Sequence, residues 1–170
     1  MTHGDKKYWL LKSEAACYSI DDLRKDRRSD WTGIRNYQAR NFIRDGMRVG
    51  DMVLFYHSSS DLKGVYGIAR VVSKAHLDPT SIDKKDEHFD PKAVAKEADI
   101  KKGKAKPGEH LWFSIDVSFV NKFAYPISLA EIKRDPALMG MMVAARGSRL
   151  SVQPVSERHF KHIVETLASK

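Results

Sequence analysis

The chain has 170 residues, 42% of them hydrophobic and 31% charged, which indicates one soluble globular domain over residues 1–170 with a core of its own. It has no apolar run near the roughly 20 residues of a membrane span, no signal-peptide pattern in its opening MTHGDKKYWLLKSE, and a single cysteine, Cys17, so an intracellular protein is expected. A compact chain without a nuclear-targeting tail favours the bacterial cytoplasm, in association with the nucleoid or not. Thirty Lys and Arg residues against 22 Asp and Glu residues give a formal net charge of +8, which favours polyanionic partners such as nucleic acids.

The first 46 residues predict one strand and two short helices. Residues 7–12 (KYWLLK) read as a short, largely buried strand. Ser19 is the expected N-cap of the first helix, and Asp22, three residues later, gives a pattern close to a capping box. A loop then leads into a short helix near residues 36–45, which Gly46 ends.

The middle of the chain predicts strands around a long polar excursion. Residues 49–57 and 64–75 carry β-branched and aromatic runs joined by the turn SSSDLKG, as in a pair of strands. Residues 78–110 are polar, lysine-rich and interrupted by prolines, so we expect a long surface excursion. Residues 111–123 alternate well enough to predict one long strand.

Two helices are predicted near the C-terminus. Ser128 and Glu131 form a capping box at the start of the first, and Pro136 ends it. Residues 155–168 predict the second, because apolar side chains recur there at helical spacing: Phe160, Ile163, Val164 and Leu167. Strands, irregular segments and peripheral helices together favour an α+β, barrel-like domain.

The stretch WTGIRNYQARNFIR, residues 31–44, is the clearest candidate for a binding site. It lies in a basic segment, since Arg24 to Arg48 contains eight basic and three acidic residues. Aromatic rings and side-chain amides recognise the faces and edges of nucleobases, whereas arginines bind phosphates. In this stretch the rings that can stack on a base are Trp31 and Tyr37, and the amides that can bind its edges are Asn36, Gln38 and Asn41. The cations that can bind phosphates are Arg35, Arg40 and Arg44. A helix with core residues such as Phe42 is the structural alternative.

Polar residues also follow two predicted strands. Lys12, Ser13 and Glu14 end the first strand, and Tyr56-His57-Ser58 ends the next. Each group is either a solvated strand end or part of a polar cluster at a barrel mouth. If both strand ends open to the same face, they converge with residues 31–44.

Other chemistries have weak support in the sequence. The pair His159 and His162 lacks a nearby third ligand, and the glycines of GVYG lie inside a strand pattern rather than in a phosphate-binding loop. Cys17 precedes a helix start, where a thiolate can be stabilised, but a small buried thiol is the commoner case. We therefore expect no metal and no cofactor.

Seven segments, in order and spacing, resemble the EVE domain, a member of the PUA-like superfamily: YWLLKSE, WTGIRNYQARN, GDMVLFYHSS, GVYGIARVV, DPTSID, LWFSIDVSFV and RGSRLSVQPVS. The resemblance runs from about Tyr8 to Leu167. It implies a PUA-like β-barrel of about five to six strands flanked by short helices, with a cleft that accepts an extruded base. Relatives in the superfamily read 5-methylcytosine or N6-methyladenine.

Carried over motif by motif, the resemblance implies a set of base-binding or nucleic-acid-binding residues: Trp9, Lys12, Ser13, Glu14, Trp31, Arg35, Asn36, Gln38, Arg40, Tyr56, His57, Ser58, Ser151 and Gln153. Two positions depart from the family pattern. Ala15 replaces the usual proline after KSE, and Thr32 replaces an acidic residue after the tryptophan. These changes put the base preference in doubt.

The function expected is a monomeric, non-enzymatic reader of a flipped, modified base, most directly a modified cytosine in DNA. An RNA-binding module for modified RNA shares the same features. An amidohydrolase resembling ASCH domains would use Lys12, Ser13 and Glu14, yet adjacent strand residues point to opposite faces. A protein-interaction scaffold with an incidental basic face is the remaining alternative.

Overall fold

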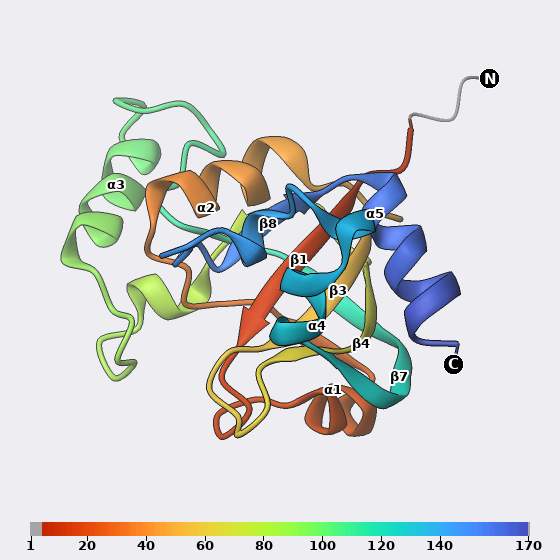
Figure 1. Ribbon diagram of the computed structural model, residues 1–170. Coiled ribbons are helices and arrows are strands. Elements are labelled where there is room, and N and C mark those ends of the chain that lie inside the picture. Colours follow the sequence, from red (N-terminus) through yellow and green to blue (C-terminus); the bar gives the residue numbers. More distant parts are fainter. Residues whose placement is uncertain (1–4, 170) are drawn as a thin grey trace.

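The computed structural model describes residues 5–169, so the first four residues of the opening segment lie outside the described residues. Six strands form one curled sheet: β1 (Tyr8–Ser13), β2 (Arg28–Asp30), β3 (Met52–His57), β4 (Gly64–Val71), β7 (Asp116–Ser128) and β8 (Val152–Val155). Their order across the sheet is β2-β7-β4-β3-β1-β8, so β4 and β3 are its central strands (Figure 1).

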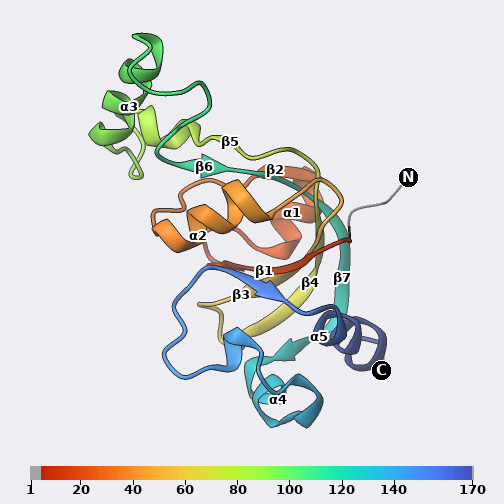
Figure 2. The ribbon, with the colours of Figure 1, turned by 90° about the horizontal axis from the view of Figure 1, so that it is seen from above.

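The pairing of β1 with β3 is parallel, whereas the other pairs in the sheet are antiparallel. Lys12 pairs with Tyr56 and Ser13 with His57, so both strands end at the same edge. Close approach of β4 to β7 requires a glycine, because a Cβ at Gly67 would lie 2.3 Å from the carbonyl oxygen of Asn121. Figure 2 shows the resulting curl, with β7 arching around one side.

Short helices lie against the sheet: α1 (Ile20–Asp26), α2 (Tyr37–Asn41), α4 (Leu129–Arg134) and α5 (Glu157–Lys161). The helix α3 (Pro91–Lys101) projects away from it (Figure 2). Single turns of 3-10 or π geometry lie at Phe42–Gly46, Pro79–Ile82, Pro136–Leu138, Met142–Ala144 and His162–Leu167. Both predicted capping interactions are present, at Ser19 with Asp22 and at Ser128 with Glu131. Among the described residues, no helix has the length and apolar character needed to cross a membrane.

The core divides between the two faces of the sheet, because successive strand residues point to opposite sides. On one face, Trp9 and Phe55 pack with α1, Trp31 and α2. On the other face, Leu10 and Tyr56 pack with α4, α5 and the turns between them. This division decides which of the predicted site residues can meet.

Three features differ from the predicted elements. The excursion contains the eleven-residue helix α3, for which Asp90 is the N-cap and Pro91 the first residue, a signal readable in the sequence. The predicted strand at 111–123 is interrupted at Ile115: β6 (Phe113–Ser114) pairs with β5 (His76–Leu77), and β7 continues to Ser128. The short strands β2 and β8 were not predicted, because their pairing partners are distant in sequence. The remaining predicted strands and helices are confirmed, and the architecture is α+β with a curled, barrel-like sheet.

Candidate functional site

A cleft of about 550 Å³ opens at the edge where β1 and β3 end. Its walls are these strand ends, the β3–β4 turn, α4 and the segment 143–151. Five of the predicted site residues line it: Lys12, Glu14, Tyr56, Ser58 and Ser151. Its volume is in the range of small-molecule sites.

Strand alternation selects these residues. Lys12 and Glu14 lie on one side of β1 and its exit, and their neighbours Tyr56 and Ser58 lie on the same side of β3. Ser13 lies between them and points away, with its Oγ donating a hydrogen bond to the carbonyl of Tyr18. The Lys, hydroxyl and carboxylate set of an amidohydrolase is therefore not assembled by residues 12–14.

Buried donors fix the segment that closes the cleft. Lys12 donates from Nζ to the carbonyl of Ser148 at 3.0 Å, and its backbone N–H donates to that of Ser151. The amide of Gln153, which is 1% exposed, donates to Ser148 Oγ at 3.1 Å and to the carbonyl of Leu150 at 2.8 Å. Gln153 thus lies behind the segment and supports it.

The rim of the cleft is cationic. Lys63, Lys133 and Arg149 line it, and none of them forms an ion pair with another described residue. Burial, with a contribution from Lys63, lowers the pKa of Lys12. Glu14 is the one carboxylate in the lining. The cleft therefore favours an anion at its rim and offers one strong acceptor.

Tyr56 is the aromatic residue among the described residues that line the cleft. It is 2% exposed, and Lys12 Nζ lies 5.9 Å from its ring centroid. Burial raises the pKa of its phenol, so the hydroxyl remains a donor. That hydroxyl has no hydrogen-bond partner in the described part of the chain. A planar ligand with polar edges matches such a lining.

Trp31 and Trp9 lie on the opposite face of the sheet from the cleft. Trp31 is 8% exposed and packs edge-on against Phe55, with ring centroids 5.4 Å apart. The indole N–H of Trp9 donates to Asp51 at 2.9 Å, and its ring contacts the partly buried Phe42 at 5.7 Å. Because Phe55 and Tyr56 point to opposite faces, the sheet separates Trp31 from the cleft, and the expected convergence of residues 31–44 with the strand ends does not occur.

His57 is also on the opposite face. It is 4% exposed, accepts a hydrogen bond from the backbone N–H of Ile20 at 3.1 Å and stacks on Tyr66 at 3.8 Å between centroids. Burial lowers the pKa of its imidazole, in agreement with a neutral ring that accepts through Nε2. It connects the sheet to α1.

Arg35 anchors the excursion at residues 78–110. Its guanidinium makes five hydrogen bonds, to Asp78, Thr80 and the carbonyls of Ile34 and His88. Burial raises the pKa of Asp78, but hydrogen bonds from Thr80, Arg35 and Gly33 outweigh it and hold that pKa below its ordinary value. All five N–H donors of Arg35 are thus engaged inside the protein.

The other residues of the stretch lie along α2. Asn36 is its N-cap and accepts from the backbone N–H of Ala39, while Gln38 is exposed. Arg40 lies over the ring of Tyr37, 4.8 Å from the centroid, and Tyr37 stacks on Trp112 with centroids 5.0 Å apart. These side chains form a surface separate from the cleft.

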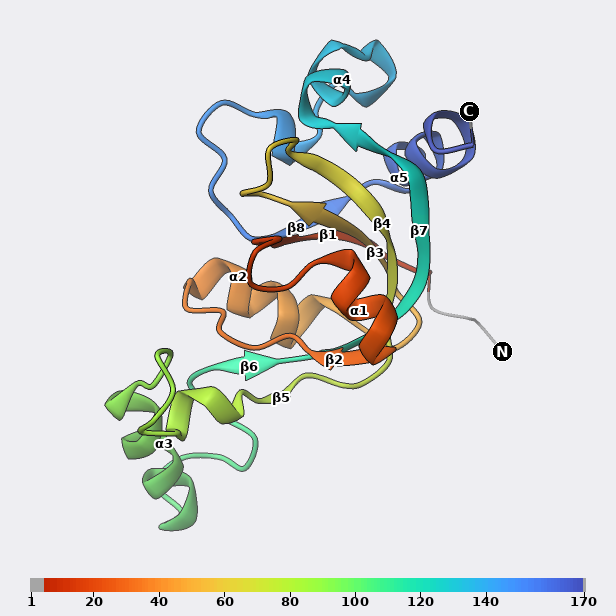
Figure 3. The same cartoon turned by 90° about the horizontal axis from the view of Figure 1, so that it is seen from below.

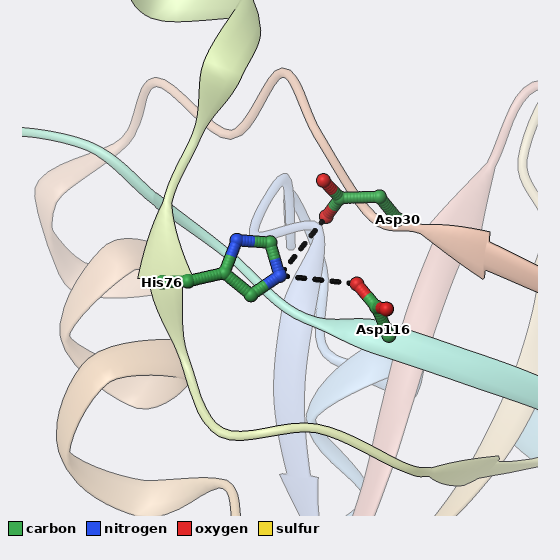
Figure 4. A group of neighbouring side chains, drawn as sticks. All are labelled: Asp30, His76 and Asp116. Atoms are coloured by element: carbon green, nitrogen blue, oxygen red, sulfur yellow. Dashed lines mark hydrogen bonds and ion pairs between the residues drawn. The ribbon is translucent and has the colours of Figure 1, made fainter.

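A histidine between two carboxylates joins β2, β5 and β7 (Figure 4). His76 Nε2 lies 3.0 Å from Asp116 and 3.6 Å from Asp30, and these three groups have spacing that could hold a metal. Burial lowers the pKa of His76, but its bonds to Asp116 and the Leu77 carbonyl and the charge of Asp30 outweigh this and raise it. Arg28 pairs with the other oxygen of Asp116 at 2.7 Å. Arg28 and the His76 ring, whose protonated form these carboxylates favour, thus face Asp30 and Asp116, and the cluster is an ion-pair clamp.

Sequence reasoning missed three cations of the rim. Arg149 stands inside the motif RGSRLSVQPVS, so that motif contained a usable signal. Lys63 lies in the turn that follows Ser58, and this proximity to a predicted strand end was a weaker signal. Lys133 had no signal in the sequence, because only the packing of α4 against the end of the sheet brings it to the cleft.

Comparison with known proteins gives one family. The EVE domain matches residues 7–166. Thymocyte nuclear protein 1 of Danio rerio is 35% identical over 175 residues, which cover 92% of this chain and 70% of that protein.

Two solved structures show the same fold. A hypothetical protein from Leishmania major has a TM-score of 0.81 and 44% identity, over 95% of this chain and 94% of that chain. The human THYN1 protein, solved in complex with 5-methylcytosine containing DNA, has a TM-score of 0.81 and 31% identity, over 97% and 99% of the two chains. These similarities confirm the predicted α+β PUA-like fold.

Proposed function

The chain belongs to the EVE domain family, and we propose that it is a non-enzymatic reader that binds duplex DNA and accommodates a flipped, modified cytosine in the cleft. The observation that carries the proposal is the lining of this cleft. The unpartnered hydroxyl of Tyr56 and the acceptor Glu14 lie inside a rim of cations that form no ion pair with a described residue. The complex of the related human THYN1 protein supports DNA as the ligand.

Each part of the lining has a role toward a nucleotide. Glu14 can accept a hydrogen bond from the exocyclic amine of cytosine, and the Tyr56 hydroxyl can donate to its ring nitrogen or carbonyl. Lys63, Lys133 and Arg149 can bind the flanking phosphates. Contacts of these kinds offset the few kcal/mol that extruding a base costs.

A second hollow fits a base less well. It has a volume of about 800 Å³ and lies at the opposite end of β1. Its lining, as far as the described residues show it, consists of Asp5, Lys6, Lys7, Arg48, Val49, Gly50 and Asp51, without an aromatic ring. The Tyr56 hydroxyl and the Glu14 carboxylate therefore favour the cleft at the ends of β1 and β3.

The test is the affinity for matched oligonucleotides that carry cytosine, 5-methylcytosine or 5-hydroxymethylcytosine, as duplex DNA and as RNA, at low salt. We expect tightest binding to duplex DNA with a modified cytosine. Glu14→Ala should weaken it about tenfold or more. Glu165→Ala, on the C-terminal π turn, is the matched control and should have no effect. The absence of binding to any of these oligonucleotides would refute the proposal. A preference for RNA would show that the ligand is RNA rather than duplex DNA.

A further inference from the structure

Four lysines lie within six residues at the end of α3: Lys101, Lys102, Lys104 and Lys106. All four are exposed, and none forms an ion pair with another residue in the described range. Cations at a helix C-terminus are stabilised by the helix dipole, which accounts for Lys101 and Lys102. Lys104 and Lys106 lie beyond that last turn, so this lysine tip has an excess of positive charge that the helix does not require.

The lysine tip belongs to a well-anchored excursion rather than to a loose loop. Trp112 donates its indole N–H to Asp90 at 2.8 Å, and His110 pairs with Glu97 at 2.7 Å. Arg35 holds the other end of the excursion through Asp78. Because these contacts anchor the backbone that carries the lysines, less backbone entropy is lost when a partner binds them.

An exposed aromatic residue lies at the root of the same excursion. Tyr37 is 54% exposed, although it stacks on the buried Trp112. Arg40 lies against both rings, 4.8 Å and 5.9 Å from their centroids. A ring and a guanidinium presented together suit the sugar and phosphate groups of a nucleic-acid strand.

The elements that carry these groups and the segment that closes the cleft lie along one side of the molecule (Figures 2 and 3). In Figures 2 and 3, α2 lies between β1 and the projecting α3, and the segment 143–151 that closes the cleft is on the same side of the molecule. On the basis of the proposed function, we propose that the lysine tip and Tyr37 form a second contact surface for the phosphate backbone of the DNA duplex whose flipped base occupies the cleft. The protein then requires a duplex long enough to extend from the cleft past α2 to α3.

The experiment compares two DNA lengths, each with one central modified cytosine. The first is a hairpin duplex of about 10 base pairs, which leaves about half a helical turn on each side of that base. The second is a duplex of about 25 base pairs, which leaves about one turn on each side. Affinity is measured over a series of salt concentrations for the wild type, K104Q/K106Q and the matched control R158Q/K161Q. Arg158 and Lys161 lie on α5, which Figure 2 places on the opposite side from α3.

We expect K104Q/K106Q to bind the long duplex about five- to tenfold more weakly and to lower the slope of log K against log salt by about 1.8, because two phosphate contacts are lost. The short duplex and the control should be unaffected. Unchanged affinity and slope of K104Q/K106Q on the long duplex, or an equal loss in the control, would overturn the second surface.

The proposed function is tested separately in the same series. Glu14→Ala should weaken both duplex lengths equally, because it acts at the base. If Glu14→Ala has this effect and K104Q/K106Q has none, the cleft proposal stands and the second surface is rejected. If the wild type binds neither duplex, both proposals are rejected.

Discussion

The two faces of the sheet carry similar polar and aromatic side chains near the ends of β1 and β3, but the two sets differ in whether they have hydrogen-bond or packing partners inside the protein. On the cleft face, Arg149 and the Tyr56 hydroxyl have no partner among the described residues. On the opposite face, Arg35 makes five hydrogen bonds within the protein and Trp31 is packed in the core. Residue type alone does not identify a binding group, because a donor that is already satisfied internally must break those bonds to hold a ligand.

Among the variants that test this comparison, Trp31→Ala should have the largest effect on the free energy of unfolding. Removal of a ring packed on Phe55 leaves a cavity and should lower the free energy of unfolding by about 3 to 5 kcal/mol. Urea denaturation measures this loss. At a temperature where the variant is folded, its affinity for DNA should equal that of the wild type. A stable variant with lost binding would place Trp31 in the site after all.

Arg35→Met should have the next largest effect on stability. Asp78 has a fully buried side chain, and the substitution leaves its charge without the guanidinium. We expect the free energy of unfolding to fall by about 3 kcal/mol. The double variant R35M/D78N should recover part of this loss in a double-mutant cycle. Additive losses would show that the two residues are not coupled.

Gln153→Leu tests the support behind the cleft. The change removes two donated hydrogen bonds at nearly constant volume, so stability should fall by about 1 to 2 kcal/mol. Hydrogen exchange at residues 148–150 should accelerate, and DNA affinity should fall with it. Gln38→Leu, at an exposed position on α2, is the control and should change neither property.

Arg149→Gln should leave stability within about 0.5 kcal/mol of the wild type, because the side chain is exposed and forms no ion pair with a described residue. Its effect is on binding: the slope of log K against log salt should fall by about 0.9. Arg44→Gln is the comparison, since Arg44 is paired with Asp45. Equal slopes for Arg149→Gln and the wild type would remove Arg149 from the interface.

The smallest expected effect is a pH dependence of the His76 clamp. Its folded-state pKa is raised above the ordinary 6.5, so its stabilisation is complete below that value and is lost as the pH rises through the raised pKa. Melting temperature from pH 5 to 9 should therefore decline at the alkaline end, and His76→Asn should reduce that decline. An unchanged decline in the variant would assign it to other groups.

The sequence by itself determined the local elements and their ends. Ser19 with Asp22, and Ser128 with Glu131, set two helix starts, because a capping box uses only neighbouring groups. Alternation along KYWLLKSE also placed Lys12 and Glu14 on one side and Ser13 on the other. The family motifs extended this local information to the fold.

Only the tertiary structure decided which polar groups are available to a ligand. The parallel pairing of β1 with β3 brings Lys12 beside Tyr56, and the packing of α4 adds Lys133. The docking of the excursion uses four of the five hydrogen bonds of Arg35, to Asp78, Thr80 and His88, which no local pattern of residues 31–44 reveals. The reason is physical: hydrogen-bond satisfaction depends on partners that are distant in the chain, whereas capping and alternation depend on neighbours.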